Sequence, residues 1–124
     1  MNDSAFWSMG EQRSSSSRQH DYNELILVSL SHYDVVAASS QSSWLNPPFE
    51  LTGLNGYLYG RGASDNKGPF LASLWAVAGL YNSGELDMDV VFLAEGEEEA
   101  GSGGFAESVR GYKVPLTYDY AISY

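Results

Sequence analysis

The chain is organised around the stretch GRGASDNKGP, residues 60–69, which carries one aspartate, Asp65, at its centre. Two other polar sites accompany this stretch. His32 and Asp34 end an apolar run upstream, and the acidic sequence EGEEEAGS, residues 95–102, ends another apolar run downstream. Histidine and carboxylates are the zinc ligands that a chain without cysteine can offer. The simplest chemistry that the three sites share is therefore metal binding.

Composition indicates one folded, soluble domain. Of the 124 residues, 44% are hydrophobic and 14% are aromatic, which is enough apolar material for a core. The 16 acidic and 6 basic residues give a net charge of -10, which disfavours nucleic acid and anionic membranes as partners and favours cations. No apolar run approaches the roughly 20 residues that span a bilayer, and no signal peptide is visible. We therefore expect a cytoplasmic protein.

The first 20 residues differ in composition from the rest. They contain the run Ser14–Ser17 between two arginines and few apolar side chains. Such a segment cannot bury enough apolar surface to offset the entropy lost on ordering. We predict a flexible, serine-rich tail over residues 1–20 and a folded domain over residues 21–124.

Two short apolar runs predict buried strands. They are LILVSL at residues 25–30 and VVFLA at residues 90–94, and both are too short and too evenly apolar for surface helices. Between them, residues 70–81 are apolar almost all round, follow Pro69 and precede the stop signal Asn-Ser-Gly. We expect a helix there, and a helix of this composition should be largely buried.

The remaining pattern completes an α/β fold. We predict a packed loop over residues 37–56, a short strand at 57–59, a helix within 102–113 and a third strand at 118–123. Strand, helix and strand in this order are typical of a parallel crossover, whose ligands gather beyond the carboxyl ends of the strands. The expected fold is part of a mixed, mostly parallel sheet flanked by helices.

Each polar site also has an ordinary structural interpretation. An isolated His-x-Asp pair, such as His32 and Asp34, is commonly satisfied by a local hydrogen bond, and a glutamate run is commonly a solvated surface. Two features favour a site at residues 95–99. The run follows an apolar strand without a break, and the glycines at 101, 103 and 104 suit a tight turn. For Arg61 and Lys67 we favour packing or local ion pairs over substrate contact.

Five motifs together resemble a known enzyme family. They are HYDVV at 32–36, Trp44 followed by PPF at 47–49, GYLYGRG at 56–62, SDNKGP at 64–69 and EGEEEAGS at 95–102. In this order and spacing they resemble the dinuclear-zinc peptidases, which include carnosinase-type dipeptidases, aminoacylases and glutamate carboxypeptidases. The resemblance covers roughly residues 25–124 and is strongest to the dipeptidase branch, including the fungal subunit of the glutathione-degrading complex.

The resemblance assigns roles to five residues. It implies that His32 binds one zinc, Asp65 bridges both zinc ions of a complete site, and Glu99 binds the other, with Mn²⁺ or Co²⁺ as possible substitutes. Asp34 would orient His32, and Glu98 would be the general base for hydrolysis of a dipeptide or short peptide. The sequence AGS at 100–102 sets this register, although Glu97 and Glu98 remain an alternative base and ligand pair.

The chain also departs from the family pattern. The family's third ligand, usually acidic, would fall at or near Tyr124, and its second histidine and its lid or dimerisation domain would lie further along. Three of five protein ligands remain, so we expect the N-terminal part of a catalytic domain that is inactive alone. The resemblance implies that the full-length protein is a homodimer or a subunit of a peptidase–amidotransferase complex.

Two other functions remain open at this point. One is a non-catalytic, peptidase-like subunit of an amidotransferase-type glutathione-degrading complex, which would have a stable partner and bind metal weakly. The other is an acidic module that takes calcium or magnesium through the oxygens of residues 95–99. The second alternative predicts no role for His32.

Overall fold

The computed structural model describes residues 5–9, 25–38, 43–111 and 119–123. Along the chain these residues form the elements β1 (Ala5–Met9), β2 (Ile26–His32), β3 (Thr52–Leu54), β4 (Tyr57–Tyr59), α1 (Lys67–Ser83), β5 (Asp89–Glu95), the 3-10 turn η2 (Glu98–Ala100), α2 (Phe105–Gly111) and β6 (Tyr120–Ser123).

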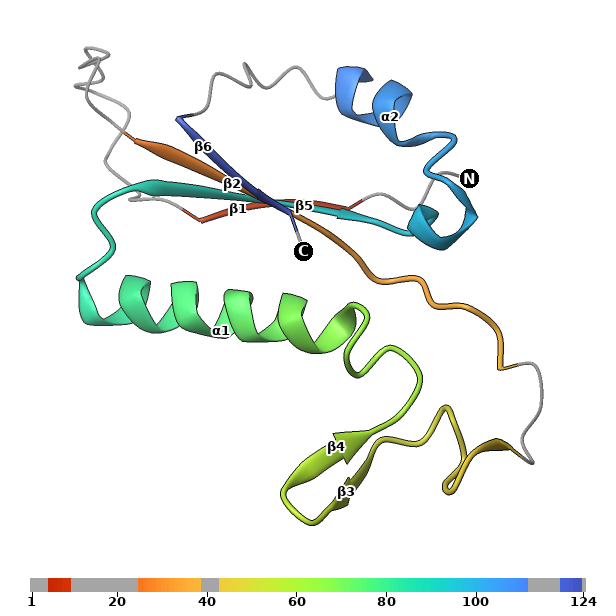
Figure 1. Ribbon diagram of the computed structural model, residues 1–124. Coiled ribbons are helices and arrows are strands. Elements are labelled where there is room, and N and C mark those ends of the chain that lie inside the picture. Colours follow the sequence, from red (N-terminus) through yellow and green to blue (C-terminus); the bar gives the residue numbers. More distant parts are fainter. Residues whose placement is uncertain (1–4, 10–24, 39–42, 112–118, 124) are drawn as a thin grey trace.

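Four strands form a mixed sheet in the order β1-β5-β2-β6. β2 pairs in parallel with both β5 and β6, whereas β1 pairs antiparallel with β5. Helix α1 lies on one face of the sheet and α2 on the other (Figure 1). The predicted α/β fold, a mostly parallel sheet flanked by helices, is confirmed.

The core lies along the two predicted apolar strands. Val28 of β2 and the β5 residues Val90, Phe92 and Ala94 are buried, and the ring of Phe70 in α1 lies 6.2 Å from that of Phe92. Both strands extend beyond their apolar runs, β2 to His32 and β5 to Glu95. The sheet therefore carries one polar residue at the carboxyl end of each central strand.

Helix α1 forms where we predicted a helix and ends as expected. Gly84 adopts the left-handed conformation with φ 73°, and its N–H donates to the carbonyl of Tyr81. The prediction that this helix is largely buried is wrong, because no residue of α1 is fully buried and the side chain of Trp75 is 78% exposed. Only one side of α1 faces the sheet, and the described residues place nothing over the opposite side (Figure 1).

The structure differs from the predicted tail at Ala5–Met9. These residues form β1 and pair with β5, with Ala5 opposite Ala94 and Met9 opposite Val90. The edge of β5 offers unpaired backbone donors and acceptors, and the apolar, partly aromatic sequence AFWSM suits a strand. The serine run and residues 20 and 21 lie outside the described residues, so the predicted domain boundary stays a prediction.

The predicted loop over residues 37–56 contains a strand that the sequence did not indicate. Thr52–Leu54 form β3, which pairs antiparallel with the predicted strand β4. Asn55 and Gly56 join them with φ of 52° and 79°, the two positive values of a type I′ turn. Arg61, after β4, stacks over Trp44 with its guanidinium carbon 5.1 Å from the ring centre, consistent with a packing role.

The last predicted helix and strand are present with shifted bounds. α2 spans Phe105–Gly111 within the predicted range, and β6 spans Tyr120–Ser123. Residues 112–118 lie outside the described residues, and so does Tyr124, at or near which the family's third ligand position would fall. Within the described ranges, none of the helices has the length and apolar character needed to cross a membrane.

Candidate metal centre

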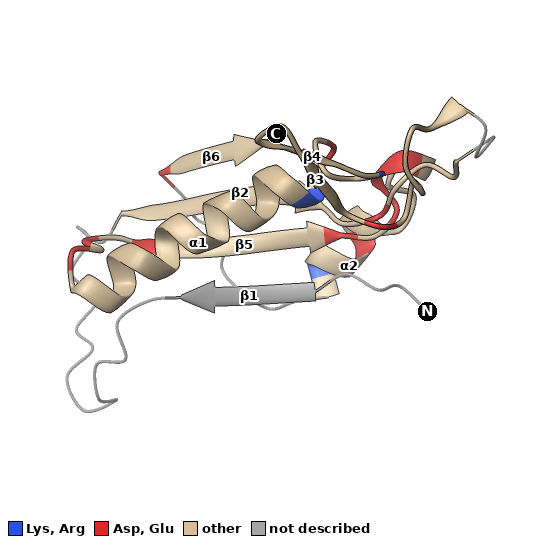
Figure 2. Cartoon of the chain, turned by 90° about the horizontal axis from the view of Figure 1, so that it is seen from below, with Lys and Arg blue, Asp and Glu red and all other residues tan. Residues whose placement is uncertain are grey.

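The polar residues converge at the carboxyl ends of β2 and β5. His32 ends β2 and stands in register with Glu95, which ends β5. Acidic residues gather at this end of the sheet and in the loops beside it (Figure 2). The parallel crossover thus brings the polar ends of both strands to one edge of the sheet, where ligands of such folds gather.

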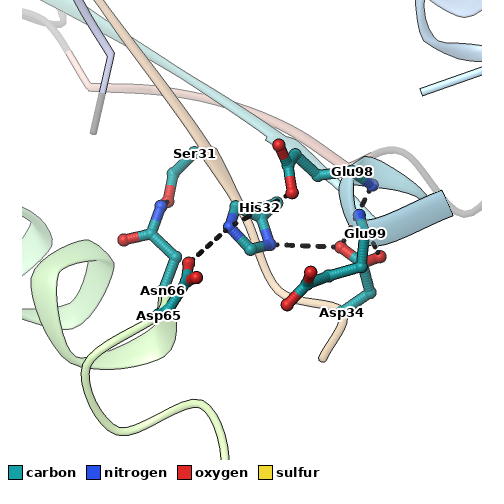
Figure 3. Close-up of polar contacts among 7 residues, drawn as sticks. All are labelled: Ser31, His32, Asp34, Asp65, Asn66, Glu98 and Glu99. Atoms are coloured by element: carbon teal, nitrogen blue, oxygen red, sulfur yellow. Dashed lines mark hydrogen bonds and ion pairs between the residues drawn. The ribbon is translucent and has the colours of Figure 1, made fainter. Parts of the chain in front are cut away.

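His32 is buried and held from both ring nitrogens. Its Nδ1 lies 3.2 Å from Oδ1 of Asp34, and its Nε2 lies 3.0 Å from Oδ1 of Asp65 (Figure 3). Residues two apart on extended backbone point to the same side, which is why Asp34 reaches the imidazole. The predicted contact between Asp34 and His32 is confirmed.

The loop before α1 delivers Asp65 to this imidazole. Gly62 turns the chain with φ 83°, and a Cβ built there would lie 2.6 Å from Cγ1 of Val35, so no larger residue fits without movement. Next to Asp65, the buried side chain of Asn66 donates from Nδ2 to Oγ of Ser31, 3.0 Å away. This bond fixes the loop to β2, while the side chain of Asp65 stays 77% exposed.

Asp34 also holds the glutamate turn. Its Oδ1 accepts a hydrogen bond from the backbone N–H of Glu98 at 3.2 Å, and its Oδ2 accepts one from the N–H of Glu99 at 3.0 Å. These N–H groups open the 3-10 turn η2, where a carboxylate is favourable. Gly101 then ends the turn with φ 94°. One carboxylate thus positions both His32 and the turn.

Three residues offer a compact set of metal ligands. One donor atom each from His32, Asp65 and Glu99 lies within 4.8 Å of the other two. Ligands at about 2.0–2.1 Å from a tetrahedral zinc lie roughly 3.3 Å apart, and the 3.0 Å between His32 and Asp65 is close to this separation. The donor set, one imidazole and two carboxylates, fits zinc.

The charges around His32 favour its protonated form. Burial lowers the pKa of the imidazole, but the hydrogen bond to Asp65, the negative charge of Glu98 and the contact with Asp34 raise it. The result is a pKa above the ordinary value of 6.5. Oε2 of Glu98 lies 3.8 Å from Nε2. A metal at Nε2 would replace the proton and meet the same negative charges.

A cavity of about 340 Å³ opens beside these residues. It is lined by Leu30, Ser31, His32, Asp65, Glu95, Glu98, Ser102 and Ser123. Of the predicted site residues, His32, Asp65 and Glu98 therefore border one space, whereas Asp34 and Glu99 do not line it. The roles of all five as ligands, orienting residue and base stay predictions. Sequence reasoning did not single out Glu95, Asn66 or Ser31, and the only available signal was that Glu95 directly follows a strongly apolar run.

Residues 28–123 match the model of a protein family described as peptidase family M20/M25/M40. The probable di- and tripeptidase DUG2 of Saccharomyces cerevisiae is 49% identical over 81 residues, which are 65% of this chain and 9% of that protein. The human Beta-Ala-His dipeptidase is 46% identical over 79 residues, 63% of this chain and 16% of that protein.

Solved structures agree in fold. Human carnosine dipeptidase 1 superposes with a TM-score of 0.78 at 33% identity, over 97% of this chain and 24% of that one. The metallo-carboxypeptidase Sso-CP2 of Sulfolobus solfataricus gives 0.82 at 30% identity, over 99% and 26%. The chain thus spans about a quarter or less of the length of these relatives.

Proposed function

The chain belongs to peptidase family M20/M25/M40, and on this basis we propose that the protein carrying it hydrolyses the peptide bond of dipeptides or short peptides. Support for the substrate class comes from relatives named as dipeptidases and as a di- and tripeptidase. The observation that carries the proposal is the group His32, Asp65 and Glu99, whose donor atoms lie within 4.8 Å of one another. Two of them, His32 and Asp65, line the cavity.

We propose zinc as the metal, with Mn²⁺ or Co²⁺ as substitutes. His32 would hold one ion through Nε2, Glu99 would hold a second, and Asp65 would bridge them. The metal supplies Lewis acidity toward the peptide carbonyl and a lower pKa for water. Asp34 keeps the imidazole oriented through Nδ1, which is the arrangement expected of a partner to a metal-binding histidine.

Glu98 is the residue that we propose as general base. Its carboxylate borders the cavity and is half exposed, so a water molecule and a peptide can reach it. It would accept the proton of the attacking water and return it to the leaving amine. The backbone N–H groups of Glu98 and Glu99 both donate to Asp34, which fixes the main chain at these two positions. This supports our choice of Glu98 and Glu99 as the base and ligand pair.

The two alternative functions gain less support. The cation module predicts no role for His32, yet this imidazole contacts Asp65 and belongs to the ligand group. No contact of the described residues specifically favours a non-catalytic subunit. A homodimer, a place in a larger peptidase complex and a cytoplasmic location stay predictions for the full-length protein, as does inactivity of this chain alone.

Zinc stoichiometry of the purified chain tests the metal site. We expect bound zinc in the wild type, none in His32→Ala or Asp65→Ala, and unchanged binding in Glu107→Ala, which removes an exposed acid on α2. Asp34→Asn should weaken zinc affinity by about 10- to 100-fold without abolishing binding, since it acts through His32. Equal zinc binding by wild type and His32→Ala would contradict the assignment.

Dipeptide hydrolysis tests the reaction. The complete gene product that contains this sequence should cleave dipeptides when loaded with zinc, and Glu98→Gln should lower kcat by about 100-fold or more while zinc stays bound. This chain should be assayed beside it. A zinc-loaded complete protein that cleaves none of a panel of dipeptides and tripeptides would overturn the proposed activity.

A further inference from the structure

Glu95 is a buried acid that the proposed reaction leaves unused. It ends β5 opposite His32, and its backbone carbonyl accepts a hydrogen bond from the N–H of Tyr33 at 2.9 Å. Only 6% of the residue is exposed. Its place is fixed by the sheet, so the carboxylate is held at the cavity by rigid backbone.

One carboxylate oxygen of Glu95 has no hydrogen-bond partner among the described residues. Its Oε2 is buried and accepts no hydrogen bond from any part of the chain that the structure describes. A buried carboxylate oxygen without a donor is unfavourable, and native proteins rarely retain one without a reason. The missing donor must therefore come from outside the described residues.

The cavity is lined by more acidic than basic side chains. Three of its lining residues are acidic, and none is lysine or arginine. Asp65 contacts His32 and belongs to the ligand group, and Glu98 also faces the imidazole. Glu95 is outside that group. When the proposed metal ions and His32 have engaged the other acids, the charge of Glu95 is still available to a cation.

We propose that Glu95 binds the free amino-terminal ammonium group of the peptide substrate, and that the site therefore selects unblocked peptides. This inference rests on the proposed function. The carboxylate would accept a charge-assisted N–H···O bond, which is stronger than a neutral one. Ser31, Ser102 and Ser123 line the same cavity and offer hydroxyl oxygens to the remaining ammonium protons.

The surroundings of Glu95 suit an ammonium group better than a further metal ion. Zinc is bound by imidazole, thiolate and carboxylate side chains, and sites of this kind gather several of them around one point. Among the described residues, Glu95 is not part of any such group, and the other cavity residues outside the ligand and base set are serines and a leucine. Serine hydroxyls are ordinary hydrogen-bond acceptors, so they complete an ammonium site.

Paired substrates test this proposal in the zinc-loaded complete gene product. Alanyl-alanine carries the ammonium group, and N-acetyl-alanyl-alanine lacks it. We expect Glu95→Gln to raise KM for alanyl-alanine on the order of 10- to 100-fold, with a smaller change in kcat and little change for the acetylated substrate. Glu95→Asp should recover part of the loss. Glu107→Gln, which removes the same charge from exposed α2, should behave as wild type.

Two results would overturn the role of Glu95. One is an equal loss on both substrates, which would assign Glu95 to the structure of the site alone, and the other is no loss on either. If the wild type cleaves neither peptide, the proposed function fails, and direct binding decides the role of Glu95.

In that measurement, alaninamide or its N-acetyl form is added to the zinc-loaded 124-residue chain, and binding is detected by NMR. Binding of alaninamide alone, lost in Glu95→Gln, supports the inference. Equal binding of both compounds, equal binding by wild type and Glu95→Gln, or no binding overturns it.

Discussion

Strand β5 and helix α1 are both strongly apolar in sequence but differ in burial. In β5, Val90 and Phe92 are each only 1% exposed, whereas in α1 Trp75 is 78% exposed and Leu71 is also exposed. β5 has a strand on each side and faces α1 with Phe92, while α1 meets the sheet along one side only. An apolar sequence thus shows that an element can be buried, and the presence of neighbouring elements determines whether it is buried.

The largest expected difference between β5 and α1 is in the loss of stability when a large side chain is removed. Phe92→Ala should lower the free energy of unfolding by about 3–5 kcal/mol, because it opens a cavity between β5 and α1. Trp75→Ala should change it by no more than about 0.5 kcal/mol, since the side chain is mostly in water. Urea denaturation of the purified chain measures both.

If Phe92→Ala fails to fold, Phe92→Leu gives a smaller step of about 1 kcal/mol in the same direction. A loss from Trp75→Ala as large as that from Phe92 would contradict the comparison, because it would mean that the outer side of α1 is packed in solution.

Two glycines within α1 sharpen the comparison on a smaller scale. A Cβ at Gly68 would overlap the backbone carbonyl of Ala63, whereas one at Gly79 would meet no atom within 4 Å. Gly68→Ala should therefore cost about 1–3 kcal/mol and disturb the loop that carries Asp65. Gly79→Ala should stabilise the chain by about 0.5–1 kcal/mol, because alanine is the better helix former.

Thermal unfolding monitored by circular dichroism distinguishes these variants. The two variants should change the stability in opposite directions, although both substitutions add the same methyl group to the same helix. Equal stabilisation by both would show that the first turn of α1 does not lie against the loop as described.

The smallest expected effect is the pH dependence of stability. It arises from His32 at the polar end of the buried strands, whereas α1 contributes no such titrating histidine. The pKa of His32 is raised in the folded chain above its unfolded value of 6.5, by Asp65, Glu98 and Asp34 against the opposing effect of burial. Its contribution to stability in the metal-free chain is therefore complete below pH 6.5 and is lost as pH rises through the folded pKa.

Urea denaturation of metal-free wild type and His32→Gln at several pH values from about 6 to 8 measures this contribution. The difference between the two proteins should shrink as pH increases. A difference that grows with pH would reverse the assigned sign.

Much of the fold was readable from the sequence because the two central strands coincide with short apolar runs and the helix between them has clear start and stop signals. β2, β5 and β6 were predicted, and so was α1 with its end at Gly84. β3 was missed because its three residues, Thr-Gly-Leu, carry almost no strand signal of their own. β1 was missed because a five-residue segment next to a serine run gains its structure from the edge of β5.

The site was readable only in part. The contact between His32 and Asp34 follows from local alternation, and the nearness of Asp65 and Glu99 to His32 was implied by resemblance to a family. The sequence could not separate Glu95 from the acids that follow it. Sheet register alone places Glu95 opposite His32, and register depends on pairing between residues more than 60 positions apart.

The double use of Asp34 has a consequence for how this site can evolve. Its carboxylate binds the backbone N–H groups of residues 98 and 99, so the turn is held through atoms that every amino acid other than proline provides. The side chains at these two positions can therefore be exchanged without dismantling the scaffold beneath them. New chemistry at this end of the sheet needs only new side chains on an unchanged main-chain frame.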